Sequence, residues 1–141
     1  MTYNFNNAFD SFVNKKSRIY FLVKDAHWTF IWWVITQCDI ERALMNGPGK
    51  FNNLQFTLRV HDVTDILFNG YNSHRFIDID VTGLTDHWYF NISENGRNYL
   101  VEAGFKKHDN SIIPIIHSNT IFLPTDISCP GTEIWKTVEN N

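Results

Sequence analysis

Short segments rich in β-branched and aromatic residues, separated by turn signals, are the feature of this chain that most limits its fold. They recur about every 8–12 residues, which is the spacing of an antiparallel β-sandwich. Apolar and polar side chains alternate clearly in residues 54–61, and the Asn95-Gly96 dipeptide is a strong hairpin signal. We therefore expect seven or eight strands: Arg18–Val23, Trp28–Thr36, Leu54–Val63, Arg75–Val81, Trp88–Ile92, Arg97–Phe105, Ile112–Ile116 and Thr120–Leu123.

One or two short helices are expected beside the strands. Near the N-terminus, five apolar residues recur at helical spacing and form one stripe: Phe5, Ala8, Phe9, Phe12 and Val13. Asp39 is a candidate N-cap for a second helix, Asp39–Met45, which the sequence Gly47-Pro48-Gly49 would end. The predicted organisation is an N-terminal amphipathic helix or arm over residues 1–16, an all-β sandwich domain over 17–124 and a C-terminal tail over 125–141.

Composition excludes several classes of function. The chain has 141 residues and a net charge of −3, so it lacks the basic excess of a general nucleic-acid binder. Its longest apolar run, Phe30 to Ile35, is far shorter than the roughly 20 residues that cross a bilayer. No secretory signal is seen at the start, and two cysteines are too few for a disulfide framework. We expect a cytoplasmic protein with reduced thiols, bound to neither nucleic acid nor membrane.

Motifs for catalysis or metal binding are missing from the sequence. The six histidines show no zinc-binding spacing, and Gly47-Pro48-Gly49-Lys50 lacks the rest of a phosphate-binding loop. No Gly-x-Ser-x-Gly sequence is present. Asp78 and Asp80 share one face of a predicted strand, opposite an apolar side assigned to Phe76, Ile77, Ile79 and Val81; two solvated carboxylates are a commoner arrangement than a calcium site. We predict no enzyme activity, no cofactor and no metal.

The run Phe30 to Ile35 is unusual because it is apolar on both faces of the predicted strand. A sandwich strand normally buries one face and exposes the other. Burial of each large side chain is worth about 1.5–3 kcal/mol, so we expect something to cover the outer set. The cover could be the helix at Asp39–Met45, the segment Phe5 to Val13, a second chain or a flat ligand.

Several polar residues lie in or beside strands whose other residues are predicted to be buried in the core. A buried charge requires a partner, so Arg59 is expected to pair with Glu102 or Asp62, and Asn119 to cap loop backbone groups. These residues form either a network that stabilises the fold or the polar floor of a ligand groove.

Aromatic residues near turns are a second set of candidates. Sugars stack on flat rings while Asp, Asn or Arg bind their hydroxyls, so Asp25 beside Trp28 suits that chemistry. Tyr71 and Trp135 are further candidates of this kind, whereas Trp88 and Tyr99 fit core positions better.

The order of several motifs resembles a bacterial family of domains of unknown function, the one numbered four-nine-one-two. The motifs span about residues 17–124 and occur in this order: Asp25-Ala26-His27-Trp28, Trp32-Trp33, Leu58-Arg59-Val60-His61-Asp62-Val63-Thr64, Asn69-Gly70, Trp88-Tyr89, Arg97-Asn98-Tyr99-Leu100-Val101-Glu102-Ala103-Gly104, Ser118-Asn119 and Pro124. The resemblance implies an immunoglobulin-like β-sandwich and no established activity. Some members are attached to enzymes that act on α-glucans, which suggests sugar binding by analogy. Ala26, Val34 and His117 depart from the family pattern, so a ligand site built on those positions would be altered here.

Two functions of different class remain. The first is a non-catalytic binding or interaction domain that recognises a protein partner or itself. The alternative is a carbohydrate-binding module for an α-glucan-like polysaccharide. The candidate binding residues are Asp25, Trp28, Arg59, Asp62, Tyr71, Trp88, Glu102 and Asn119.

Overall fold

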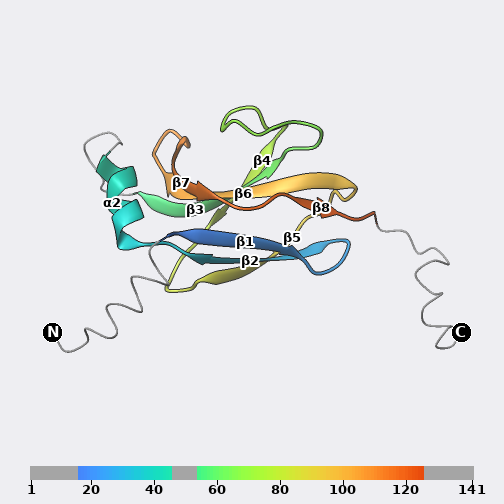
Figure 1. Cartoon of the computed structure of the whole chain (residues 1–141), viewed down its shortest axis with the longest axis horizontal. Helices are drawn as coiled ribbons and strands as arrows, with labels where there is room; N and C mark the ends of the chain where they lie inside the picture. Colours follow the sequence, from blue (N-terminus) through green and yellow to red (C-terminus); the bar gives the residue numbers. More distant parts are fainter. Residues whose placement is uncertain (1–15, 46–53, 126–141) are drawn as a thin grey trace, which may run out of the picture.

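The computed structural model of the chain describes residues 16–45 and 54–125. These residues form eight strands in two antiparallel sheets and one short helix, which confirms the expected mostly β architecture. The two sheets lie as separate layers with their inner faces toward each other (Figure 1). The expected helix or arm at the N-terminus and the tail after Thr125 lie outside the described residues.

The smaller sheet has three strands in the order β1-β2-β5, namely Arg18–Val23, Trp28–Val34 and His87–Asn91. β1 and β2 form the expected hairpin, and Phe21 pairs with Ile31 in its register. β5 pairs with the other edge of β2.

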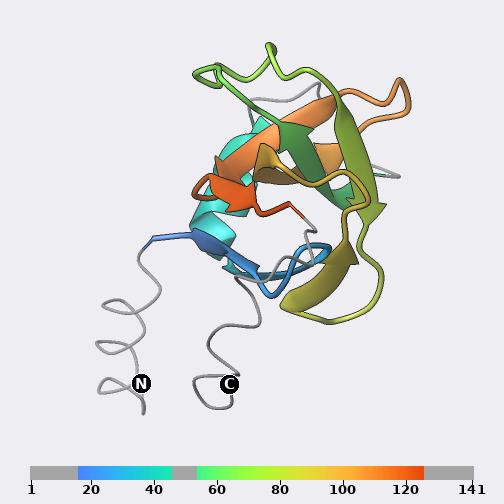
Figure 2. The same cartoon turned by 90° about the vertical axis from the view of Figure 1, so that its right-hand side faces the viewer.

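The larger sheet is organised by its longest strand, β6 (Arg97–Lys106). β3 (Gln55–Asp62) lies on one side of β6 and separates it from β4 (Phe76–Asp80). On its other side, β6 pairs first with β8 (Ile121–Leu123) and then with β7 (Ile112–His117). Seen from the end of the sandwich, β1 and β5 lie below the green and orange strands of this sheet (Figure 2).

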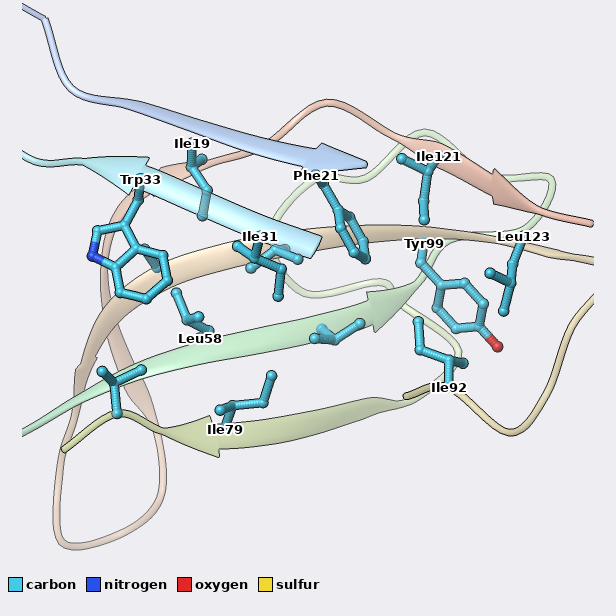
Figure 3. Close-up of a cluster of buried hydrophobic side chains, with 14 residues drawn as sticks. Ile19, Phe21, Ile31, Trp33, Leu58, Ile79, Ile92, Tyr99, Ile121 and Leu123 are labelled. Atoms are coloured by element: carbon cyan, nitrogen blue, oxygen red, sulfur yellow. The ribbon is translucent and has the colours of Figure 1, made fainter. Parts of the chain in front are cut away.

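The hydrophobic core fills the space between the two sheets. Phe21 and Ile31 enter it from the smaller sheet and meet Leu58 and Tyr99 from the larger one (Figure 3). Tyr99 is buried, as the sequence predicts, and its hydroxyl donates a 2.6 Å hydrogen bond to the carbonyl of Glu94. The core therefore also satisfies the polar atom that an aromatic ring of this type brings with it.

The short helix α2 (Gln37–Met45) begins two residues before the predicted position. The hydroxyl oxygen of Thr36 accepts a 3.1 Å hydrogen bond from the amide of Asp39, so Thr36 is the N-cap and Asp39 lies in the first turn. The prediction of Asp39 as the cap is therefore wrong. α2 packs against β7 of the larger sheet.

Asn119 joins the two sheets at the free edge of β1. Its side-chain oxygen accepts a 3.1 Å hydrogen bond from the amide of Phe21, and its amide nitrogen donates a 2.9 Å bond to the Phe21 carbonyl. The prediction that Asn119 binds backbone groups is confirmed, although the backbone belongs to a strand rather than a loop. The side chain satisfies two groups that an edge strand would otherwise expose.

One assignment of strand faces is wrong. Phe76 was expected on the apolar side of its strand, but its ring lies on the same outer face of β4 as Asp78, over the guanidinium of Arg59. A side-chain period of two places residues 76, 78 and 80 together. The outer face of the larger sheet is therefore polar and charged, with Phe76 as an aromatic cover.

Candidate functional site

The outer face of the smaller sheet carries a continuous group of large apolar side chains. We call it the aromatic face and define it as Tyr20, Leu22, Phe30, Trp32 and Tyr89. Strand alternation places them there, because their neighbours Phe21, Ile31 and Trp33 point into the core. Trp32 is 36% exposed and Tyr89 is 55% exposed.

Cross-strand ring contacts hold the aromatic face in a defined shape. Tyr20 lies opposite Trp32 in the register, and their rings stack with centroids 5.2 Å apart and planes 16° apart. Phe30 lies between Leu22 and Tyr89, with the Tyr89 ring centroid 4.9 Å away. Such pairs stabilise a sheet and fix the rotamers of the rings. The face is thus preorganised for contact with a flat apolar surface.

The outer side of residues 30–35 is partly exposed in the described part of the chain, so the prediction that the helix at Asp39–Met45 covers it is wrong. Trp33 is buried in the core, whereas Trp32 is exposed, and Phe30 is only half-buried. The helix that was expected to cover the outer side packs on β7 instead. The segment Phe5 to Val13, the other intramolecular cover considered, lies outside the described residues.

The β1–β2 turn and the end of β5 enclose a second feature, an open hollow of about 650 Å³. Asp25 organises the turn by accepting hydrogen bonds from the amides of His27 (3.0 Å) and Trp28 (2.8 Å). These backbone bonds lower the pKa of Asp25 from its ordinary value. Trp28 is exposed, and Asn91 and Ser93 complete the polar lining. The structure therefore does bring the predicted residues Asp25 and Trp28 together.

Arg59 is buried but pairs with neither of its predicted partners. Its guanidinium binds Asp78 through two hydrogen bonds of 2.7 and 3.0 Å and donates a third, of 2.6 Å, to the carbonyl of Asn110. The ring of Phe76 lies 4.0 Å from the guanidinium carbon. These contacts engage Nε, Nη2 and one flat face of the guanidinium, so Arg59 is a structural tie that links β3 to β4 and to the loop between β6 and β7.

Glu102 belongs to a different buried pair that the sequence did not suggest. His61 Nε2 lies 2.9 Å from the Glu102 carboxylate, and His61 Nδ1 lies 2.8 Å from the Ser73 hydroxyl. The ring of Phe68, from the loop between β3 and β4, stacks obliquely on His61 at 4.6 Å. This loop therefore covers the pair and keeps it from solvent.

Asp62 anchors a third cluster and is only 1% exposed. One carboxylate oxygen accepts a 2.5 Å hydrogen bond from Arg97 and lies 3.2 Å from Arg75. The other oxygen accepts bonds from the amide and hydroxyl of Thr64, at 3.1 and 2.7 Å. Burial raises the pKa of Asp62, but the bonds from Arg97 and Thr64 outweigh it and lower the pKa from 3.8 to about 2.

The depressed pKa of Asp62 predicts a specific loss of stability in acid. A lowered pKa in the folded state stabilises the fold above the ordinary value of 3.8, and this contribution disappears as the pH falls from about 4 toward 2. The contribution is about 2 kcal/mol. We expect the difference in unfolding free energy between the wild type and Asp62→Asn to shrink over that range, measured by urea denaturation at each pH. Asp109→Asn, at an exposed carboxylate bonded to Ser111, is the control and should differ little from the wild type.

The remaining predicted residues lie apart from these clusters. Tyr71 is 95% exposed in the loop between β3 and β4. Trp88 is half-buried and packs against the core, as expected for a strand tryptophan. The eight candidate residues therefore do not form a single site. Trp135 lies outside the described residues.

The two acidic side chains of β4, Asp78 and Asp80, pair with basic side chains. Asp78 binds Arg59, and Lys106 Nζ lies 2.9 Å from Asp80, whose side chain remains about half exposed. No three His, Cys, Asp or Glu side chains in the described ranges gather as a metal ion would require. Within the same ranges, no helix is long and apolar enough to cross a membrane.

None of the candidate binding residues predicted from the sequence belongs to the aromatic face. The alternation within Trp28–Val34 identifies Phe30 and Trp32 as the outer set, but Tyr20 and Tyr89 join them only through the pairing of β1 and β5 with β2. A reading of the hairpin register would have added Tyr20.

A comparison with protein-family models matches residues 15–131 to a domain of unknown function, DUF4912. The chain belongs to the DUF4912 family. The match spans all eight strands of the described structure and confirms the resemblance drawn from the sequence motifs. No curated protein matches the chain.

Proposed function

We propose that this DUF4912 domain is a non-catalytic interaction domain, an immunoglobulin-like β-sandwich that binds a protein partner or a second copy of itself through the aromatic face. The observation that carries the proposal is the continuity of exposed apolar rings across β1, β2 and β5. Contiguous apolar patches of this kind are uncommon on the free surface of a monomer. Tryptophan and tyrosine are also the residues that contribute most to protein interfaces.

The ring geometry favours a protein over a sugar on this face. Tyr20 and Trp32 stack on each other, so each ring has one flat side already occupied. A sugar stacks on an open ring face, whereas a protein side chain also packs against ring edges and the aliphatic Leu22. The pattern is one of aromatic and aliphatic groups together, as in the core of an interface.

A photo-crosslinking amino acid placed at Tyr89 tests this proposal. In the producing cell we expect an adduct of one discrete mass, either twice 16.6 kDa for a second copy or that of one other protein. Trp32→Ser should reduce the adduct about tenfold or more, since it removes a central anchor worth about 2 kcal/mol. The same crosslinker at Tyr71, which is exposed but distant from the aromatic face in the fold, is the control. Equal, diffuse labelling from both positions would count against the proposal.

A second candidate, an α-glucan-binding module, is supported by the hollow at the β1–β2 turn. It combines the exposed indole of Trp28 with the polar side chains of Asp25, Asn91 and Ser93. Ala26, where the family pattern commonly has proline, also lines this hollow.

Affinity gel electrophoresis in soluble starch or glycogen tests the second candidate. If the hollow binds such a chain, the wild type is retarded and Trp28→Ala loses about tenfold in affinity, since stacking on the indole contributes about 1.4 kcal/mol. Tyr71→Ala serves as the matched control because Tyr71 is an exposed aromatic residue away from the hollow. An unretarded wild type at high polymer concentration would exclude this candidate.

A further inference from the structure

The end of the sandwich beside α2 holds an apolar groove that none of the described residues fills. It has a volume of about 620 Å³ and is lined chiefly by apolar side chains, which include Trp33, Ile35, Ile40, Phe56, Leu84 and Phe105. α2 marks this end of the molecule in Figure 1, and Trp33 lies at the end of the core cluster in Figure 3. The groove is distinct from the aromatic face, because Trp33 points inward where Trp32 points outward.

The rim of the groove includes an apolar side chain with no cover among the described residues. Leu84 is fully exposed and follows Gly83, which has a positive φ of 78°. Three of the lining residues, Trp33, Phe56 and Phe105, form a row of ring contacts, each 5.9 Å between centroids. An aromatic side chain in the groove would therefore meet other aromatic rings.

The chain enters the described structure right beside this groove. Ser17 is buried, and its hydroxyl accepts a 2.9 Å hydrogen bond from the amide of Thr36 and donates a 2.5 Å bond to Asp39. Thr36 directly follows Ile35 of the groove, and Asp39 precedes Ile40. Ser17 is thus held beside the groove by two side-chain contacts.

We propose that the N-terminal segment of this same chain, residues 5–13, docks its apolar stripe into the groove. The stripe supplies Phe9 and Phe12, which match the aromatic lining, and Phe12 lies only five residues before Ser17. Lys16 lies seven positions after Phe9, a distance of about 10 Å along a helix or up to about 25 Å in an extended chain. The segment therefore reaches the groove without a long linker, and its high effective concentration favours docking in cis over docking in trans.

Disulfide trapping in the full chain tests the docking. Cys38→Ser and Cys129→Ser remove the natural thiols, and Leu84→Cys places one at the exposed rim. With Phe9→Cys as the partner we expect an intramolecular disulfide to form about tenfold or more faster than with Asn7→Cys, which lies off the stripe. The products are identified by non-reducing electrophoresis and peptide mass mapping.

Other occupants give different products in the same assay. A disulfide-linked dimer in place of the monomer would show a second copy in the groove and would overturn docking in cis. Faster trapping with Phe51→Cys than with Phe9→Cys would assign the groove to residues 46–53. Equal rates for Phe9→Cys and Asn7→Cys would show no docking of the stripe. Trapping of Phe9→Cys by Tyr89→Cys rather than Leu84→Cys would place the segment on the aromatic face, which overturns this proposal and also removes the face from the proposed function.

Discussion

Replacing Arg59 with alanine is expected to lower the free energy of unfolding by about 3 kcal/mol. The variant loses the bidentate bond to Asp78, the bond to the Asn110 carbonyl and the packing against Phe76. Asp78 is left largely buried with only Lys106, whose Nζ is 3.6 Å away, to compensate its charge. Removal of one partner of a buried pair costs about 3–5 kcal/mol, and the remaining lysine places the expected value at the lower end. Urea denaturation followed by tryptophan fluorescence measures it.

Two further variants identify the cause of that loss. Arg42→Ala removes an exposed arginine that pairs with Asp39 within α2, and we expect a loss of less than about 1 kcal/mol. Arg59→Met combined with Asp78→Leu replaces the buried pair with apolar side chains, and it should recover most of the stability lost by Arg59→Ala. A folded Arg59→Ala variant of wild-type stability would show that Arg59 is not a structural tie. Arg59 would then again be a candidate for contact with a ligand.

The partner of Arg59 illustrates where the sequence stops being informative. Since β3 lies between β4 and β6, Arg59 has Asp78 opposite on one side and Glu102 opposite on the other. The strands themselves could be predicted from alternation, but their order in the sheet could not. Glu102 binds His61, which lies two residues beyond Arg59 on β3, so Arg59 binds Asp78 instead. The choice depends on three strands at once, and local patterns contain no such information.

The aromatic face shows a related difficulty on the smaller sheet. A run that is apolar on both sides is expected to be covered on both sides. The sequence of a single strand does not show which of its faces packs against the second sheet. In the described structure Ile31 and Trp33 meet the core, and Trp32 remains exposed. The fold and its core could thus be predicted in outline, whereas the surface that carries the proposed function required the register of β1, β2 and β5. Apolar pattern alone does not distinguish a buried outer face from a binding face.

Gly104→Ala is expected to destabilise the domain by about 3 kcal/mol, at the upper end of the cost of overpacking. A Cβ atom at this position would lie 2.3 Å from the carbonyl oxygen of Ile113 and 2.9 Å from a side-chain carbon of Ile112. The close atom belongs to the backbone of β7, so it cannot move away without breaking the pairing of β6 with β7. The register of this pair already shifts between Ala103 and Gly104, which shows that the close approach is built into the bulge.

Gly83→Ala is the matched control for that prediction, since it separates backbone strain from collision. A Cβ at Gly83 meets nothing within 4 Å, but the positive φ of 78° strains any residue other than glycine by about 1 kcal/mol. Gly104 has no such φ, so its larger expected cost comes from the contact with β7 alone. Thermal and urea unfolding of both variants measure the two costs. If Gly104→Ala proved no more destabilising than Gly83→Ala, β7 would pack less tightly on β6 than the structure shows. The position of β7, which supports α2 at the groove, would then be less rigidly fixed.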